Sequence, residues 1–91
     1  MVKFEWDLEK AVANARKHGV TFEEAATIFL DPLSATAYDP GHSQMEDRYV
    51  TIGSTDEGRL LAVAHCDRVD RIRIISARPL TGREQKIYEN E

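Results

Sequence analysis

The chain has 91 residues, of which 42% are hydrophobic and 31% are charged, and its net charge is -4. This length supports one modest hydrophobic core, so we expect a single domain spanning residues 1–91. No apolar run approaches the roughly 20 residues of a membrane span, and charged residues stand where a signal peptide has its apolar stretch. The composition therefore excludes a membrane or secreted class and predicts a cytoplasmic protein.

The charges are unevenly distributed. Residues 1–57 carry five Lys/Arg and eleven Asp/Glu (net -6), whereas residues 58–91 carry seven and five (net +2). A net negative charge disfavours binding to nucleic acid, because the phosphates are also negative, but a local basic stripe can still bind phosphates. Cys66 is the single cysteine, which rules out an internal disulfide and argues against a cysteine-based zinc site. We expect no cofactor.

Two helices are predicted in the first third of the chain. Residues 2–6 alternate as a strand does, and Asp7 then serves as the N-cap of a helix that ends at Gly19. Its apolar stripe is Leu8, Ala11, Val12 and Ala15. Thr21 and Glu24 form a capping box for a second helix, which stops before Pro32.

Strands dominate the remainder. The predicted strands cover residues 34–38, 48–53, 59–66 and 71–78. Short turns separate the last three, so they form an antiparallel meander. Pro79 ends the last strand, and a Thr81–Glu84 capping box opens a helix to about Tyr88. The fold class we predict is α+β: an antiparallel sheet with two N-terminal helices on one face and a C-terminal helix.

The turns suggest a strand register. Pairing Cys66 with Arg71, and Val50 with Leu61, places branched apolar residues on the face that holds the helices. The other face then reads Tyr49, Ala62, Ala64, Arg71 and Arg73. Such a face would be a shallow basic floor for a nucleotide, or simply the surface on which the last helix packs.

Several blocks resemble the BrnT family of toxins from bacterial type II toxin-antitoxin systems. They are Phe4-Glu5-Trp6-Asp7, Lys17-His18-Gly19-Val20-Thr21-Phe22-Glu23-Glu24-Ala25, Asp31-Pro32, Glu46-Asp47-Arg48, Arg71-Ile72-Arg73-Ile74-Ile75-Ser76-Ala77-Arg78, Arg83-Glu84 and Tyr88. The resemblance implies a fold related to RelE and an endoribonuclease that inhibits translation. It also implies a cognate BrnA-type antitoxin with a ribbon-helix-helix domain, a 2:2 heterotetramer, and repression of the operon through operator DNA bound by the antitoxin.

Metal-independent RNA cleavage by the 2'-hydroxyl needs a base, an acid and cations that stabilise the phosphorane. His18 is the best acid or base by intrinsic pKa, although it could equally close the first helix against the sheet. Arg48, Arg73 and Arg78 are the candidate transition-state cations. Strand alternation, however, puts Arg48 and Arg78 on one face and Arg73 on the other, so one flat cluster cannot contain all three.

Four further residues complete the candidate RNA site. Glu84 is a candidate base with a competing structural role in the capping box, and Tyr88 is a stacking or hydroxyl contact to RNA that could instead pack on the sheet. Lys17 and Arg71 are expected to contact the RNA backbone. A non-catalytic module that engages only the antitoxin or operator DNA remains the competing hypothesis.

Overall fold

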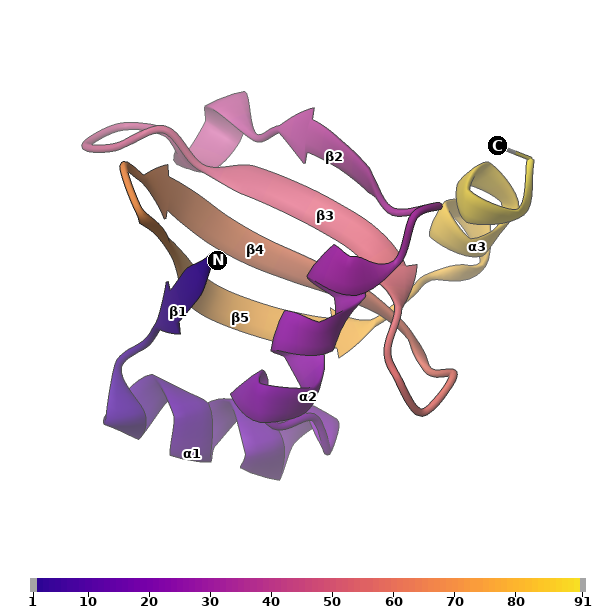
Figure 1. The fold of residues 1–91 in the computed structure, drawn as a ribbon, viewed down its shortest axis with the longest axis horizontal. Coiled ribbons are helices and arrows are strands. Elements are labelled where there is room, and N and C mark those ends of the chain that lie inside the picture. The colour runs from indigo at the N-terminus through magenta and orange to yellow at the C-terminus, as the bar shows by residue number, and fades with distance from the viewer. Residues whose placement is uncertain (1, 91) are drawn as a thin grey trace.

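The computed structural model describes residues 2–90. Its helices are α1 (Leu8–His18), α2 (Phe22–Ala26) and α3 (Gly82–Glu89), with short 3-10 helices η1 (Thr27–Leu30) and η2 (Pro40–His42). Its strands are β1 (Lys3–Glu5), β2 (Ala35–Tyr38), β3 (Tyr49–Ser54), β4 (Leu60–Arg68) and β5 (Arg71–Pro79). In Figure 1, α1 and α2 lie on one side of a curved sheet, and α3 stands at one end of it.

The helices begin where the capping residues predict. Asp7 accepts a hydrogen bond from the Lys10 N–H at 3.0 Å, and Thr21 accepts one from the Glu24 N–H at 3.1 Å. Thr81 and Glu84 form a reciprocal capping box at the start of α3. Gly19 ends α1 with φ of 67°, a left-handed conformation that favours glycine. These predicted boundaries are confirmed.

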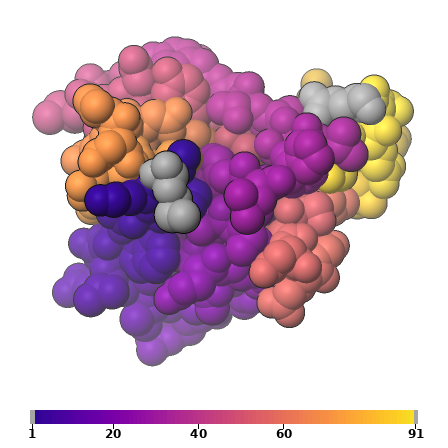
Figure 2. Space-filling view, in the orientation of Figure 1, coloured from indigo at the N-terminus to yellow at the C-terminus, as the bar shows by residue number. Residues whose placement is uncertain are grey.

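The sheet is mixed, with strand order β1-β5-β4-β3-β2. Strands β2 to β5 are antiparallel as predicted, but β1 runs parallel to β5, so the prediction of an antiparallel sheet is wrong at this edge. A parallel neighbour requires a long connection, which α1 and the rest of the chain supply. Figure 2 shows the N-terminal segment (indigo) beside the chain around the β4–β5 turn (orange), with α3 (yellow) at the opposite end.

The predicted register is also wrong. Strands β4 and β5 extend to a two-residue turn, so Arg71 pairs with Arg68 and not with Cys66. Val50 pairs with Ala64, not with Leu61, which moves Val50 to the face opposite α1 and α2. Tyr49 lies on the helix-covered face instead, where its ring stacks on His65. The basic floor expected on the other face therefore lacks this aromatic residue.

A β-bulge in β5 changes the alternation of its side chains. Ala64 pairs with Ser76, but the next residue, His65, pairs with Ile74, so Ile75 has no partner of its own across the ladder. One extra residue reverses which face the following side chains occupy. As a result Arg73 and Arg78, five positions apart, lie on the same face of the sheet.

The core lies between the sheet and the helices. Its buried members are Val20, Phe22, Ala25, Ile28, Leu61, Val63, Ile74 and Ala77, with Phe4, Trp6, Ala11, Ala26 and Phe29 packed against them. The apolar stripe predicted for α1 is only partly correct, because Leu8 and Val12 are 76% and 58% exposed whereas Asn14 is buried. Within residues 2–90, no helix is long and apolar enough to cross a membrane.

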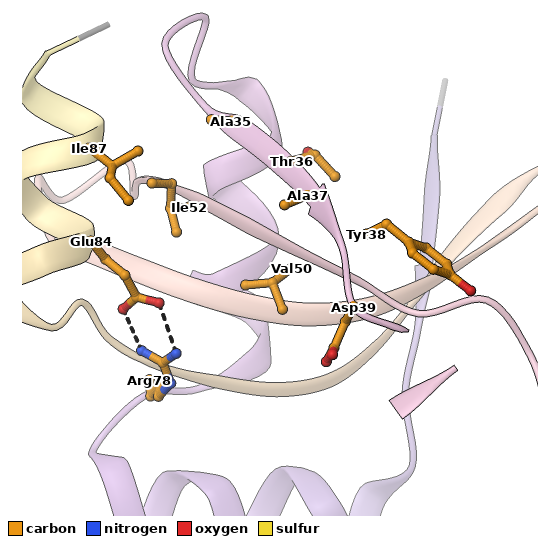
Figure 3. A pocket seen from close by; sticks show the side chains of 10 residues that line it. All are labelled: Ala35, Thr36, Ala37, Tyr38, Asp39, Val50, Ile52, Arg78, Glu84 and Ile87. Carbon is orange, nitrogen blue, oxygen red and sulfur yellow. Dashed lines mark hydrogen bonds and ion pairs between the residues drawn. The ribbon is translucent and has the colours of Figure 1, made fainter. Parts of the chain in front are cut away.

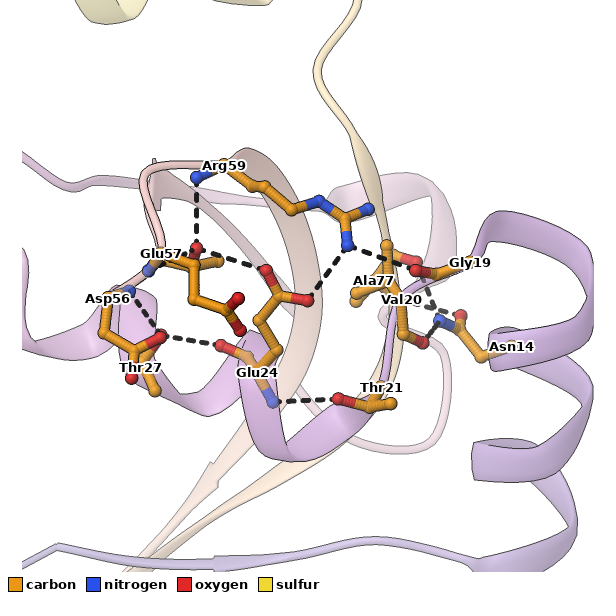
Figure 4. Close-up of polar contacts among 11 residues, drawn as sticks. Asn14, Gly19, Val20, Thr21, Glu24, Thr27, Asp56, Glu57, Arg59 and Ala77 are labelled. Atoms are coloured by element: carbon orange, nitrogen blue, oxygen red, sulfur yellow. Dashed lines mark hydrogen bonds and ion pairs between the residues drawn. The ribbon is translucent and has the colours of Figure 1, made fainter.

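Asn14 explains why α1 turns a polar residue inward. Its side-chain amide exchanges two hydrogen bonds with the backbone of Ala77 and donates a third to the Val20 carbonyl. Figure 4 shows this contact beside the ion pair of Arg59 with Glu24, in which the Nη1–Oε1 distance is 3.0 Å. Asn14 thus fixes α1 to β5, and Arg59 fixes α2 to the start of β4.

Candidate functional site

The sheet face opposite α1 and α2, called here the second face, carries most of the candidate cations. One row of paired residues crosses it through Glu5 of β1, Arg73 of β5 and Cys66 of β4. The neighbouring row holds Lys3, Arg71 and Arg68. Paired residues in adjacent strands point to the same side, so these cations form a patch at the β1 edge.

The carboxylate of Glu5 is the centre of this patch. It accepts a hydrogen bond from Arg73 Nη1 at 2.8 Å and another from Arg71 Nη1 at 3.3 Å, and Arg68 Nη1 lies 3.9 Å away. The Arg73 hydrogen bond is the main cause that holds the pKa of Glu5 below its ordinary value. The patch is therefore a set of arginines around one ionised carboxylate.

Arg48 extends the patch towards β3. It precedes Tyr49, and its backbone is held by hydrogen bonds to the Ser43 hydroxyl and the Asp39 N–H. Its charge lies close enough to the Cys66 thiol to oppose the rise in pKa that burial and Glu46 cause there. Among the described residues, Arg48 Nε is buried without a hydrogen-bond partner. This guanidinium is thus incompletely satisfied.

Arg78 and Glu84 form a second charged element on the same face. Arg78 Nη1 and Nη2 lie 2.7 and 3.0 Å from the two carboxylate oxygens, a bidentate ion pair. The Arg78 guanidinium lowers the pKa of Glu84 to about 2, against the opposing effect of burial. The pair closes one end of a groove of about 380 Å³, lined also by Ala35, Ala37, Val50, Ile52 and Ile87 (Figure 3).

Tyr88 takes part in an internal contact. Its hydroxyl donates to Asp31 Oδ2 at 2.6 Å, and the same oxygen accepts from the Ser54 N–H at 2.8 Å. Burial opposes ionisation of Asp31, but these hydrogen bonds outweigh it and the pKa of Asp31 is lowered. Tyr88 therefore anchors α3 to the loop that follows η1.

Lys17 and His18 lie at the edge of β5. Together with Lys10, they line a cleft of about 210 Å³ that ends on Ile75 and Ser76. Ser76 lies on β5 between Arg73 and Arg78, so the cleft opens beside the second face at the bulge. His18 is half-buried here and has access to this edge.

The structure thus groups the predicted residues into neighbouring sets. Arg71 and Arg73 share Glu5, Arg78 pairs with Glu84, Lys17 and His18 share a cleft, and Tyr88 is engaged by Asp31. The expectation that Arg78 and Arg73 lie on opposite faces is wrong, because the bulge was not foreseen. Glu5 and Arg68 were missed; the alternation of Phe4, Glu5 and Trp6 could have placed Glu5 on the second face.

Comparisons with known proteins identify the family of this chain. The family model described as "Ribonuclease toxin, BrnT, of type II toxin-antitoxin system" matches residues 6–84. This chain belongs to the BrnT family. The match contains the second-face arginines, Lys17, His18 and Glu84, and it confirms the family resemblance seen in the sequence. Membership implies an antitoxin partner for this BrnT-family toxin.

The fold is also similar to that of a solved BrnT. The crystal structure of the Brucella abortus ribonuclease toxin BrnT matches with a TM-score of 0.64 and 23% sequence identity, covering 89% of this chain and 99% of that chain. At this identity the likeness concerns the fold. A search of curated proteins found no match.

Proposed function

We propose that this BrnT-family chain is a metal-independent endoribonuclease that cleaves RNA and inhibits translation. The observation that carries the proposal is the bulge at Ile75, which brings Arg73 and Arg78 to the same face of β5. Arg48, which immediately precedes β3, brings its charge near Cys66, the β4 partner of Arg73 on that face. Guanidinium groups on paired strands are held firmly, as the stabilisation of a phosphorane requires.

The remaining roles follow from position. His18, at the mouth of the cleft beside Ser76, is the proposed general acid for the leaving oxygen. Arg71, the first residue of β5, and Lys17, beside the cleft at Ile75 and Ser76, contact the RNA backbone. Glu84 orients Arg78, and Tyr88 supports the same helix through Asp31. Each of these assignments extends the site along β5.

The partners belong to the same proposal. A BrnA-type antitoxin with a ribbon-helix-helix domain neutralises the toxin in a 2:2 heterotetramer, which represses its own operon through operator DNA bound by the antitoxin. The toxin acts in the cytoplasm as one domain, residues 1–91, with a fold related to RelE. The family match and the mixed sheet with its three helices support this proposal.

The test is cleavage of a defined single-stranded RNA by purified, antitoxin-free protein in the presence of EDTA. The wild type should cleave, and His18→Ala and Arg78→Ala should each lose about 100-fold or more in rate. Arg16→Ala changes an exposed cation in the last turn of α1 and should cleave normally. Circular dichroism checks the fold of each variant.

A folded wild type that leaves RNA intact under these conditions would contradict the metal-independent nuclease. Binding of the antitoxin by that same protein would then favour a module that only engages its partner. Cleavage by all the variants at the wild-type rate would remove His18 and Arg78 from the site.

A further inference from the structure

One carboxylate on the second face lies among the arginines of the proposed RNA site: Glu5 contacts Arg73, Arg71 and Arg68. We infer that Glu5 is the general base that takes the proton from the attacking 2'-hydroxyl of RNA. This inference rests on the proposed ribonuclease function and adds a catalytic residue to it.

Glu5 lies beside the arginines that would stabilise the negative charge of the phosphorane during cleavage. Arg73 and Arg71 each donate to a different oxygen of the Glu5 carboxylate, and Arg68 approaches the same oxygen as Arg73. Glu5 also lies on β1, paired residue for residue with β5. Its side chain is 24% exposed, so a ribose hydroxyl can reach it.

The other carboxylates on this face are less suited to the role. Both oxygens of Glu84 are held by Arg78, and Oε1 also accepts from the Thr81 N–H at 2.9 Å. Glu46 lies outside the strands and contacts Arg68 alone among the arginines. Glu5 differs because its oxygens are shared by single contacts from arginines of two strands, β5 and β4, and not held by one bidentate guanidinium together with a backbone N–H.

Binding of RNA would also strengthen the base. The arginines keep Glu5 ionised in the free protein, and they lower its affinity for a proton. A phosphate that draws these guanidinium groups to its own oxygens weakens their hold on the carboxylate. The proton affinity of Glu5 therefore rises at the moment when the 2'-hydroxyl must be deprotonated.

The step balances without another reactant. The 2'-oxygen gives its proton to Glu5 and forms a bond to phosphorus, while the bond from phosphorus to the 5'-oxygen breaks. The leaving 5'-oxygen takes a proton from the general acid, proposed above to be His18. The products are a 2',3'-cyclic phosphate and a 5'-hydroxyl.

The decisive variant is Glu5→Gln, which retains size and one acceptor oxygen but is not a base. We expect its single-turnover cleavage rate to fall about 100-fold or more. Its affinity for an uncleavable RNA with 2'-deoxyribose at the target position should stay equal or rise, because a negative charge beside the phosphate is removed. Glu46→Gln removes the same charge from the same patch and should cleave at the wild-type rate.

If Glu5 only neutralises the arginines, Glu5→Gln will cleave as fast as the wild type or faster, which overturns the inference. Wild-type cleavage combined with that result leaves the ribonuclease proposal intact, whereas an inactive wild type removes both. Glu5→Ala provides a second measurement should the glutamine variant unfold. Added formate should restore part of its cleavage rate, chloride at equal ionic strength should not, and equal effects of the two would contradict a missing base.

Discussion

The side-chain amide of Asn14 forms with the backbone of Ala77 the pair of hydrogen bonds that a neighbouring strand would otherwise form. Asn14 Nδ2 donates to the Ala77 carbonyl at 2.9 Å, and Asn14 Oδ1 accepts from the Ala77 N–H at 3.0 Å. Both residues are buried, so the N–H and the carbonyl of Ala77 cannot form hydrogen bonds with water instead. One helical side chain thereby completes the hydrogen bonding of β5 beyond the short strand β1.

Asn14→Ala should accordingly lower the free energy of unfolding by about 2 to 4 kcal/mol, because it leaves buried backbone groups unpaired. Urea unfolding followed by circular dichroism measures the change. Ala13 precedes Asn14 on α1 but is exposed, so Ala13→Ser should cost less than about 0.5 kcal/mol. Equal losses in the two variants would show that the Ala77 contact contributes little.

The Arg78–Glu84 ion pair should make stability depend on pH. The folded-state pKa of Glu84 is lowered from 4.5 to about 2, so its stabilising effect is fully present above pH 4.5. It is lost as the pH falls from 4.5 towards 2, where the folded protein also takes up the proton. At pH 7 we expect Glu84→Gln to be less stable than the wild type by about 1 to 2 kcal/mol, allowing for solvent screening.

Urea midpoints measured at several pH values test this expectation. The difference between the wild type and Glu84→Gln should shrink steadily below pH 4.5, since other carboxylates titrate equally in both proteins. A difference that stays constant down to pH 2 would mean that the ionised pair does not stabilise the fold.

Gly53 marks a close approach of β3 to the chain around η1. A Cβ at this position would lie 3.2 Å from Ser34 Cβ and 3.3 Å from Ile28 Cβ. Gly53→Ala should therefore lower stability by about 1 to 3 kcal/mol through overpacking. Gly82→Ala is the matched control: nothing lies within 4 Å of its added methyl, and stability should stay unchanged or rise by up to about 1 kcal/mol. Thermal unfolding of both variants checks the contrast.

Tyr88→Phe removes a hydroxyl that donates to Asp31. We expect a loss of about 1 kcal/mol, because Asp31 is partly buried and its carboxylate also holds the Ser54 N–H. Tyr38→Phe removes a similar hydrogen bond, to Asp47, at an exposed site and should change stability by less than about 0.5 kcal/mol. A Tyr88→Phe protein as stable as the wild type would argue that this hydrogen bond does not help to anchor α3.

Local signals predicted the elements of this fold well. The N-caps Asp7, Thr21 and Thr81 and the C-terminal Gly19 lie where the sequence places them, because capping depends on a few adjacent residues. The inward face of α1 was misjudged for a different reason. Asn14 is buried through a contact with Ala77, 63 residues away, and no helical periodicity reveals such a partner.

Strand register limited the prediction of the site. Assigning a four-residue turn where the structure has two displaced the pairing of β4 with β5, and the extra residue Ile75 has no signature in the alternation of Arg71 to Ile74. The missed bulge separated Arg73 from Arg78, whereas the turn error moved the pairing by two residues and left the faces unchanged. The arginines themselves were identified from residue type, but their shared face depends on the bulge.

The ladder between β1 and β5 has a consequence for how the protein is made. Glu5 and Arg73 are 68 residues apart in sequence, so this contact joins two segments that are synthesised far apart in time. During synthesis, β1 has no strand to pair with until residues 71–73 emerge, and contacts of such high sequence separation form slowly. The arginine patch therefore assembles only after β5 has been synthesised, and a ribosome-bound nascent chain that stops short of β5 does not contain it.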